Sequence, residues 1–357
     1  YLSNIQNNYK NSSYNKKKKT DSVEVVIYIG NKENLVDRIF LEMEKRNILG
    51  TSIFDVFSGT TSVAKFFKEK NYKIISNDLL YFSYVLQQAY ISNNTIPIFV
   101  LRILDELPPV SGFISKNYTP DYTQNLDIPR MYFTTENGDF IDKVRIAIQE
   151  WYEQNKITKH EYYILIACLI ETVPYYANIS GVYGAFHKKW DPRALKKMHL
   201  KPINILINQH ENQVFNSNSI NLIKTDRNLQ ADIFYLDPPY NQRQYAPNYH
   251  LLETIAKYDN PVIKGVSGMR EYTDQKSNFC NVNTAINELD DIVKYGNFRY
   301  LVMSYNSEGI IPKEALLDIL STYGQMSFVE FDYLRYKSNK RKSANKMIKE
   351  QLFFLEK

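Results

Sequence analysis

The tetrapeptide Asp237-Pro238-Pro239-Tyr240 carries the residue types in this sequence that are best suited to chemistry. Two consecutive prolines stiffen the turn and remove two N–H donors, so the groups left to face a ligand are acceptors. The Asp237 carboxylate and the Pro238 carbonyl can each take one N–H from a planar amine. Such contacts draw the nitrogen toward tetrahedral geometry and expose its lone pair. With the Tyr240 ring available for stacking, the tetrapeptide predicts a site that activates an aromatic amine.

The position of the tetrapeptide decides between this interpretation and a plain structural turn. Taken alone, the four residues are better explained as a Pro-Pro turn with a solvent-facing acid. Here they follow residues 232–236, an apolar run with the length of a buried strand. Ligands of open parallel sheets bind outside the carboxyl ends of the strands. The placement therefore favours the chemical interpretation.

A second group of small and acidic residues occupies positions 55–60, Asp-Val-Phe-Ser-Gly-Thr, at the end of the strand-like run 53–57. A turn of small residues between a strand and a helix lets a ligand approach the backbone. Asp78 follows the next predicted strand, 72–76, about 20 residues on, where an acid can accept hydrogen bonds from ribose hydroxyls. A complete G-x-G-x-x-G is absent, which argues against a pyrophosphate. By itself the pattern fits an ordinary strand-turn-helix, but beside Asp237 it predicts the other half of one site.

The elements that must position these residues alternate between strands and helices. Residues 299–304 form a further predicted strand, and residues 326–336 and 351–355 read as an antiparallel pair. Strands alternating with helices predict an α/β fold with an open, mostly parallel sheet. Residues 28–32, Tyr-Ile-Gly-Asn-Lys, precede an amphipathic run and alone indicate only the start of a helix.

Domain organisation follows from the gap between the two halves of the sheet. Residues 23–90 and 211–357 are predicted to form the sheet domain, and residues 91–210 an insertion with helices at 141–151 and 159–172. Residues 1–22 are polar and include four consecutive lysines, which indicates a flexible tail; an arm that contacts phosphates is the less favoured interpretation.

Composition limits the class of protein without naming it. The 357 residues carry a net charge of +5, a modest excess that permits a nucleic-acid partner without requiring one. Cys168 and Cys280 lie far apart and in no metal-ligand spacing, so a zinc site and a disulfide framework are not expected, and a reducing cytoplasm fits. No apolar run approaches the ~20 residues that span a bilayer. We expect a monomer with no membrane segment and no metal.

Together these motifs resemble those of the adenine-specific DNA methylases of the alpha arrangement, the family of the Dam-type enzymes and of many restriction-modification systems. Residues 28–32 resemble its N-terminal cofactor motif, and residues 55–60 its cofactor loop, with Thr61 where a second glycine often stands. Asn77-Asp78 is similar to its ribose-binding acid, and residues 237–240 to its methyl-transfer motif. Segments typical of one branch are residues 181–186, 240–245, 250–254, 304–306 and 335–337.

The resemblance implies a Rossmann-like S-adenosylmethionine-dependent methyltransferase sheet with an inserted, mainly helical target-recognition domain. It implies methyl transfer to the 6-amino group of adenine in a specific duplex DNA site, by base flipping, in a system that can include a cognate restriction endonuclease. The acid that the family often has before the catalytic strand is replaced here by Asn218. The implied cofactor-binding residues are Tyr28, Ile29, Gly30, Asn31, Lys32, Asp55, Phe57, Ser58, Gly59, Thr60, Asp78, Leu79, Asn218 and Asp237.

Other activities remain open on the same motifs. Methylation of the cytosine 4-amino group is the nearest alternative, but the first motif residue is then more often serine. RNA and protein-glutamine methyltransferases more often carry asparagine there. A non-catalytic DNA-binding subunit is a third alternative, against which the intact Asp237 and cofactor loop argue. No cysteine lies in a motif, so we expect direct transfer to the amine without a covalent enzyme intermediate.

Candidate DNA contacts lie in the predicted insertion, after the tetrapeptide and near the carboxyl end of the sequence. The dipeptide Asn137-Gly138 is a strong hairpin signal, and a hairpin there would probe the DNA, although a surface hairpin fits as well. The basic cluster 188–193 fits a phosphate-facing surface and a solvated helix start about equally. Arg243 and Tyr245 are placed to hold the flipped nucleotide. The predicted DNA-binding residues are Arg130, Asn137, Lys188, Lys189, Arg193, Arg243, Tyr245, Arg335 and Lys337.

Overall fold

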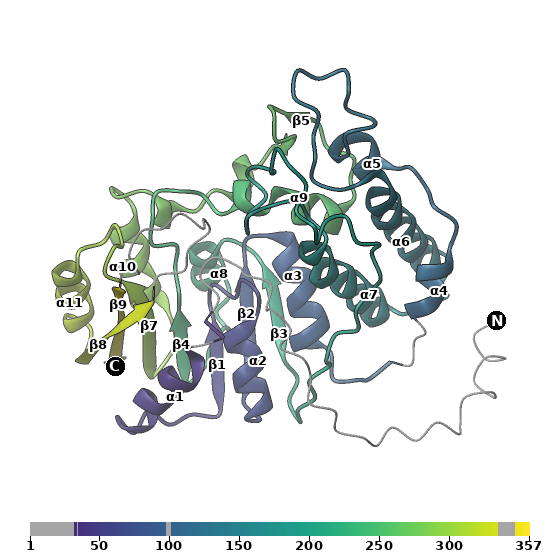
Figure 1. Cartoon of the computed structure of the whole chain (residues 1–357). Helices are drawn as coiled ribbons and strands as arrows, with labels where there is room; N and C mark the ends of the chain where they lie inside the picture. Colours follow the sequence, from purple (N-terminus) through teal and green to yellow (C-terminus); the bar gives the residue numbers. More distant parts are fainter. Residues whose placement is uncertain (1–31, 34, 98–100, 335–346) are drawn as a thin grey trace.

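The computed structural model describes residues 32–33, 35–97, 101–334 and 347–357. Seven strands form one sheet in the order β3-β2-β1-β4-β7-β9-β8 (Figure 1). Their bounds are β1 Ser52–Asp55, β2 Lys73–Asp78, β3 Gln213–Asn216, β4 Ile233–Leu236, β7 Tyr300–Asn306, β8 Gln325–Leu334 and β9 Met347–Glu356.

Five neighbouring strands of the sheet run parallel, and one strand, β9, runs against them and against β8, which has the same direction as the five. β1 pairs in parallel with β2 and β4, β2 with β3, and β4 with β7. β9 is antiparallel to both β7 and β8. The predicted Rossmann-like α/β fold with an open, mostly parallel sheet is therefore confirmed, and so is the antiparallel pair near the carboxyl end of the sequence.

Apolar residues in the short strands explain why the sheet is buried on both faces. Successive side chains of a strand point to opposite faces. Ile53 packs into the hydrophobic cluster on one face and Phe54 into the cluster on the other. Phe234 of β4 meets Phe54 edge-on, with ring centroids 5.1 Å apart. Near-continuous apolar runs are what a parallel sheet covered on both faces requires.

Helices cover each face of the sheet (Figure 1). One cluster unites the strands with α1 Val36–Glu44, α2 Ser62–Glu69, α3 Tyr81–Gln87, α7 Lys159–Thr172 and α9 Ala246–Lys257. The other unites them with α8 Ser219–Thr225, α10 Ala285–Tyr295 and α11 Lys313–Ser321. None of the helices in the described ranges is long and apolar enough to cross a lipid bilayer. Cys168 and Cys280 are buried free thiols.

The stretch between β2 and β3 holds α4 Leu101–Glu106, α5 Phe113–Tyr118, α6 Thr135–Glu153 and α7. The two helices predicted from periodicity are present as α6 and α7. A capping box between Thr158 and Glu161 starts α7. Side chains of α6 and α7 belong to the same hydrophobic cluster as α1 and β1. The division at residues 91 and 210 stays a prediction.

The hairpin predicted at Asn137-Gly138 is wrong. Both residues lie in the first turn of α6, because Thr134 caps the helix and accepts a hydrogen bond from the Asn137 backbone N–H. A side chain at Gly138 would collide with Thr119 and Ser115 of the neighbouring segment. Close helix packing therefore explains this glycine. A real hairpin occurs after α9, where β5 Ile263–Lys264 pairs with β6 Met269–Arg270.

Candidate active site

The carboxyl ends of β1, β2, β3 and β4 open onto one cavity that is continuous with solvent. This is the edge at which ligands of open α/β sheets bind. The cavity is lined by the loop after β1, by the residues after β2 and β3, and by the turn after β4. Among its lining residues are Lys32, Asp55, Phe57, Ser58, Gly59, Thr60, Asp78, Leu79, Asn218, Asp237, Pro239, Tyr240 and Tyr245, all of which the sequence predicted.

The loop after β1 is held in an unusual backbone conformation. Gly59 and Thr61 both have positive φ angles, of 51° and 65°. The Ser58 N–H donates to the Asn77 carbonyl at 2.9 Å, which ties the loop to the end of β2. No atom lies within 4 Å of where a Gly59 side chain would project. The glycine thus satisfies the left-handed backbone conformation and leaves room for a ligand against the loop.

Asp78 joins the two cofactor-loop segments. Its carboxylate accepts the Gly59 N–H at 2.8 Å through Oδ2 and the Leu80 N–H at 2.8 Å through Oδ1. Burial raises the pKa of Asp78 to about 6, against the lowering effect of these two backbone donors. Each oxygen keeps one lone-pair direction that the backbone does not use. The side chain can therefore accept further hydrogen bonds from a ligand in the cavity.

Asp55 is the most unusual acid of the cavity. It is 1% exposed, and neither carboxylate oxygen has a hydrogen-bond partner among the described residues. The buried Ser58 hydroxyl is likewise unpaired there. Burial raises the pKa of Asp55 to about 8 and the nearby charge of Asp237 adds to the rise, although the Ser58 hydroxyl and the Ala64 N–H lie close enough to lower it. Buried acceptors without donors are costly, by about 1–3 kcal/mol each, so this pair of residues fits a ligand that brings donors or positive charge.

Asp237 follows β4 directly and faces the same space. Its Oδ1 lies 3.3 Å from the Lys32 ammonium, and its side chain is 18% exposed. Burial raises the pKa of Asp237 to about 6, and the Lys32 charge limits the rise. Pro239 and Tyr240 line the cavity beside it, whereas Pro238 is buried in the turn. The Tyr240 carbonyl accepts the Ile310 N–H at 2.9 Å, which anchors the end of the turn.

Lys32 also pairs with Glu350, a residue that the sequence analysis did not predict as part of the site. Its ammonium lies 2.7 Å from Oε1 of Glu350 on β9, and that same oxygen accepts a short hydrogen bond from the Ser304 hydroxyl. Burial opposes the charge on Lys32, but Asp237 and Glu350 together raise its pKa. Glu350 shares the buried face of β9 with Ile348 and Leu352. An acid at an inward position of a predicted strand was the signal that could have revealed it.

A second missed acid, Glu253 of α9, ties the start of α3 to the segment after Tyr240. Its carboxylate accepts the backbone N–H groups of Tyr81 and Phe82, at 3.1 and 2.9 Å, and so caps the start of α3. It also accepts a bond from Gln275, a residue of the cavity wall, at 2.6 Å. This buried acid therefore positions three parts of the wall at once.

Aromatic rings flank the mouth of the cavity next to Asp237. Tyr245 stacks on Tyr249, with ring centroids 6.5 Å apart and planes inclined by 28°. Both line the cavity together with Tyr240. The Gln244 side chain exchanges two hydrogen bonds with Ser277, of 2.7 and 3.0 Å. The loop after the tetrapeptide is thereby fixed against the wall of the cavity.

Two residues predicted to bind DNA have structural roles instead. The Arg130 guanidinium is buried and donates to the carbonyls of Asn117, Gly265 and Val266, at 3.0–3.1 Å. It therefore clamps the β5–β6 hairpin. The buried Asn137 amide donates to the Ala194 and Lys196 carbonyls and accepts the Met198 N–H. These two predictions are corrected, because side chains whose polar groups are already used inside the protein cannot reach a base.

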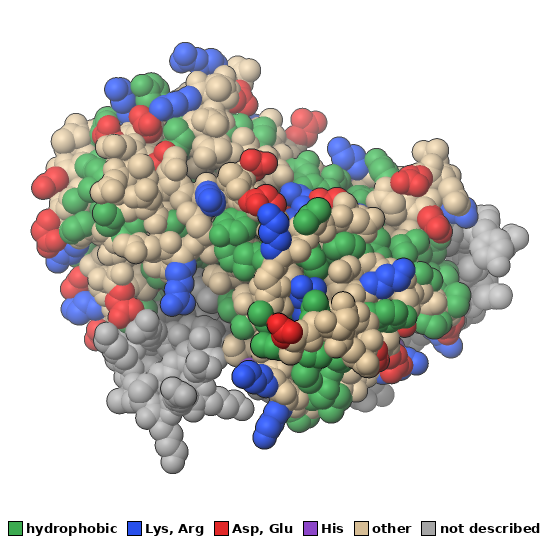
Figure 2. Space-filling view, turned by 90° about the horizontal axis from the view of Figure 1, so that it is seen from above, with side chains coloured by type: hydrophobic (Ala, Val, Ile, Leu, Met, Phe, Trp, Pro, Cys, Tyr) green, Lys and Arg blue, Asp and Glu red, His purple; other side chains and the backbone are tan. Residues whose placement is uncertain are grey.

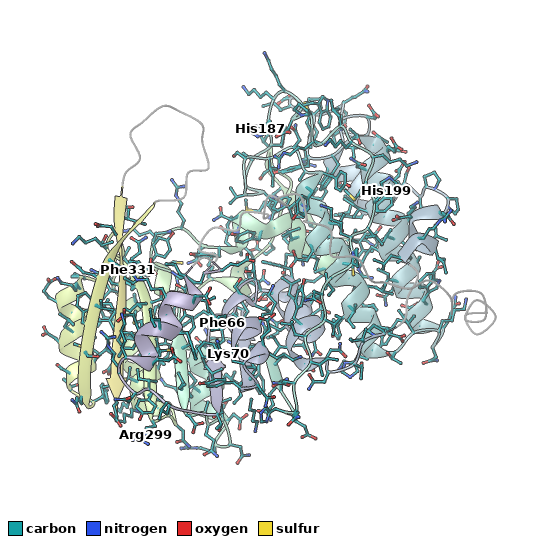
Figure 3. The ribbon with its side chains drawn as sticks, turned by 60° about the horizontal axis from the view of Figure 1, so that its bottom comes forward. Phe66, Lys70, His187, His199, Arg299 and Phe331 are labelled. Atoms are coloured by element: carbon teal, nitrogen blue, oxygen red, sulfur yellow. The ribbon has the colours of Figure 1, made fainter. Side chains whose placement is uncertain are left out.

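Of the other predicted DNA contacts that the structure describes, Tyr245 is half-buried and the rest are exposed. The exposed residues are Lys188, Lys189, Arg193 and Arg243. Arg193 already pairs with Asp191 at 2.9 Å. Figure 3 shows neighbouring His187 at the opposite end of the molecule from Arg299, which precedes β7. Figure 2 views the molecule from above, and over the described part of that face basic side chains are scattered among acidic and uncharged ones. Tyr28, Ile29, Gly30, Asn31, Arg335 and Lys337 lie outside the described residues.

No metal centre is evident in the part of the chain that the structure describes. Within it, no three His, Cys, Asp or Glu side chains gather closely enough to hold an ion. The charged side chains that line the cavity are Lys32, Asp55, Asp78, Asp237 and Glu288. Lys32 lies between Asp237 and the buried Glu350, which does not line the cavity.

Comparison with known proteins places most of the chain in one family. Residues 28–319 match the model of the D12 class N6 adenine-specific DNA methyltransferases. Type II methyltransferase M.FokI of Planomicrobium okeanokoites is 39% identical over 92% of this chain and 52% of its own length. Modification methylase StsI of Streptococcus sanguinis is 36% identical over 92% and 51%. Type II methyltransferase M.NlaIII of Neisseria lactamica is 37% identical over 89% and 94%. The chain thus spans about half the length of the first two relatives and nearly all of the third.

Proposed function

The chain belongs to the family of D12 class N6 adenine-specific DNA methyltransferases, and on that basis we propose that it methylates the exocyclic 6-amino group of adenine in double-stranded DNA. The methyl donor in this proposal is S-adenosylmethionine. One observation carries the proposal: the Asp237 carboxylate, directly after β4, faces the same cavity as Asp55 at the end of β1 and Asp78 at the end of β2.

The fit of the cavity to the donor rests on its unpaired acids. S-adenosylmethionine, when bound, supplies an electrophilic methyl group on a sulfonium cation. Asp55 offers two buried oxygens without hydrogen-bond partners in the described structure, which suits the cationic part of such a ligand. Asp78 can accept hydrogen bonds from ribose hydroxyls. Residues 57–60 leave the backbone open to close approach, and Asn218 borders the cavity where the family often has an acid.

In this mechanism Asp237 and the Pro238 carbonyl hold the amine of the target base. Each accepts one N–H, which localises the nitrogen lone pair for direct transfer without a covalent enzyme intermediate. Once methylated, the nitrogen carries a positive charge and releases one proton. With a pKa of about 6, Asp237 is ionised at neutral pH and a better proton acceptor than an ordinary aspartate. It can take that proton and pass it to water at the cavity mouth.

The target adenine must leave the duplex, because its amino group is paired inside the helix. Tyr240 and Tyr245 offer ring faces on which the flipped base can stack. Lys188, Lys189 and Arg243 are exposed and suited to phosphates. We further propose that the protein acts as a cytoplasmic monomer within a restriction-modification system that includes a cognate endonuclease. Its modification-methylase relatives support that setting.

Product analysis of methylated DNA tests the proposal. The purified protein is incubated with duplex DNA and S-adenosylmethionine, and the DNA is digested to nucleosides for mass spectrometry. We expect N6-methyladenine, at one recurring sequence when the modified bases are located by sequencing. The appearance of 4-methylcytosine alone would replace adenine by cytosine as the target. Absence of either product in a folded protein that binds the cofactor would favour a non-catalytic subunit.

A further inference from the structure

Glu350 connects the last strand of the sheet to the proposed site of methyl transfer. It lies on β9, is 3% exposed, and pairs in register with Asn306 of β7. Its Oε1 accepts hydrogen bonds from the Lys32 ammonium, at 2.7 Å, and from the Ser304 hydroxyl. The Lys32 and Glu350 positions are 318 residues apart in the sequence. The contact therefore depends entirely on the folded sheet.

Lys32 stands between two carboxylates and is closer to the one that does not face the cavity. Its ammonium is 2.7 Å from Glu350 and 3.3 Å from Asp237. Side chains of all three residues are at most 18% exposed, so attraction between the charges is only weakly screened. An ammonium has three N–H donors and moves easily toward whichever acceptor remains. Glu350 therefore determines how closely Lys32 approaches Asp237.

We propose that Glu350 is a positioning residue that holds Lys32 back from full contact with Asp237, leaving Asp237 with acceptor capacity for the amine of the target base. Lys32 has two effects on Asp237 that must be balanced. Its charge keeps the carboxylate ionised, but a tight ion pair would occupy the oxygen that the amine needs. Glu350 sets that balance from the far side of the lysine. This inference rests on the proposed function, because it concerns how Asp237 meets an amine.

If Glu350 positions Lys32, the variants Glu350→Gln and Lys32→Met should shift the pH dependence of the methylation rate in opposite directions. A purely structural role for Glu350 would not produce opposite shifts. The measurement is the single-turnover methylation rate at saturating cofactor, from pH 5 to 9. Glu350→Gln removes the negative charge that raises the pKa of Asp237 and frees Lys32 to approach it, so the acid limb should move down by roughly one pH unit. The rate on the plateau should fall at least about 10-fold. Lys32→Met removes the favourable cation, so its acid limb should move up by a similar amount.

Controls separate charge from packing. Glu330→Gln removes an exposed ion pair with Lys349 on the neighbouring strand and should leave the profile unchanged. Carboxyl ¹³C NMR titration of Asp237, in protein without DNA, reads the same shifts without any turnover. Thermal denaturation and cofactor binding check that each variant is folded. Should Glu350→Gln fail to fold, Glu350→Asp withdraws the carboxylate by one methylene and should give a smaller downward shift.

An unchanged acid limb and an unchanged rate in folded Glu350→Gln would overturn the inference. So would shifts of the same direction in Glu350→Gln and Lys32→Met, or an unshifted limb in folded Glu350→Asp. The wild-type reaction keeps this result apart from the proposed function. If the wild-type protein forms N6-methyladenine and the variants do not differ as described, only the role of Glu350 fails. If wild type forms no methylated base, the proposed function fails, and the NMR titration alone decides the role of Glu350.

Discussion

Two regions of this protein bury polar side chains, and they treat them in opposite ways. In the stretch between β2 and β3, Asp142 accepts the Gly112, Ile114 and Ser115 N–H groups and the Tyr258 hydroxyl. At the cavity, Asp55 has no hydrogen-bond partner among the described residues. Because an unpaired buried acceptor costs free energy, the first arrangement stabilises a scaffold and the second favours a ligand. Satisfaction of hydrogen bonds, more than burial or charge, separates Asp142 from Asp55.

Arg130 and Arg145 extend the contrast to cations. Arg145, 2% exposed, donates to the Ile255 and Ala256 carbonyls near the end of α9 and to the Tyr162 hydroxyl. Arg130 likewise donates to three carbonyls. A basic residue in a region expected to bind DNA can thus be an internal clamp. The contrast predicts that mutations at the cavity change function first, whereas mutations of the paired residues change stability first.

The largest effect should come from Asp237→Ala. Loss of the carboxylate removes an acceptor for the amine, and methylation of DNA should fall by about 10³-fold or more. Cofactor binding and the melting temperature should stay near those of the wild type. Nucleoside mass spectrometry and calorimetry provide the two measurements. Near-normal turnover in this variant would mean that the cavity is not the catalytic site, and would remove the functional contrast between the cavity and the stretch between β2 and β3.

Asp55→Asn should change how the free energy of unfolding depends on pH, because it removes a buried carboxyl group that has no hydrogen-bond partner in the described structure. The pKa of Asp55 is about 8 in the folded protein, against 3.8 for an ordinary aspartate. The folded protein therefore keeps a proton that the unfolded chain releases, so the stabilising contribution is complete below pH 4 and is lost as the pH rises through 8. Relative to wild type, the variant should gain roughly a few kcal/mol of unfolding free energy between pH 5 and pH 9. Denaturant titrations at both pH values measure it; a constant difference would contradict the raised pKa.

Asp78→Ala should weaken cofactor binding by about 10- to 100-fold, the worth of one or two hydrogen bonds to a charged group. Part of that loss reflects the loop, because Gly59 and Leu80 also lose their acceptor. Isothermal calorimetry with S-adenosylmethionine gives the affinity, and Asp139→Ala in the helical stretch is a matched control that should leave it unchanged. Unaltered affinity in Asp78→Ala would move the ribose contact to another acid.

Asn137→Ala should lower the unfolding free energy by about 1–3 kcal/mol, because two buried carbonyls lose their donor and one buried N–H loses its acceptor. The methylated DNA sequence should not change. Denaturant unfolding and sequencing of modified bases measure the two properties. A relaxed sequence preference without loss of stability would restore Asn137 as a DNA contact and weaken the comparison.

The smallest effect is expected from Lys188→Ala combined with Lys189→Ala. Two lost phosphate contacts should reduce the slope of log affinity against log salt by at most about 2 and leave the methylated sequence unchanged. Lys73→Ala at the start of β2, combined with Lys294→Ala in the last turn of α10, is the matched control. Filter binding across a salt series gives the slope. An equal reduction in the control pair would mean that only overall charge is being measured.

Much of the fold and of the candidate active site could be predicted, because the sequence patterns that indicate them lie within short segments. Apolar runs of strand length and the turn after each one fix which residues lie at the carboxyl edge of the sheet, and so bring Asp55, Asp78 and Asp237 together. Asn137-Gly138 misled for a local reason as well. The dipeptide favours a hairpin, but Thr134 begins a helix whose buried face then holds it.

The contacts that could not be predicted join residues that lie far apart in the sequence. The role of Arg130 depends on carbonyls 135 and 136 residues away, and Glu350 acts on Lys32 across almost the whole sequence. Such partners are set by which strands become neighbours, and no pattern within a short window carries that information. Only the inward position of Glu350 on an apolar strand hinted at a buried partner.

The place of β9 in the sheet also orders events in time. β9 lies between β7 and β8, and within the described sheet β8 pairs with no other strand. A growing polypeptide therefore leaves open edges on β7 and β8 until β9 has left the ribosome and is inserted between them. Until then Lys32 lacks Glu350 as its second acid. The loop after β1 and the turn after β4 can form before β9 is available, but the contact between Lys32 and Glu350 forms only with the insertion of β9.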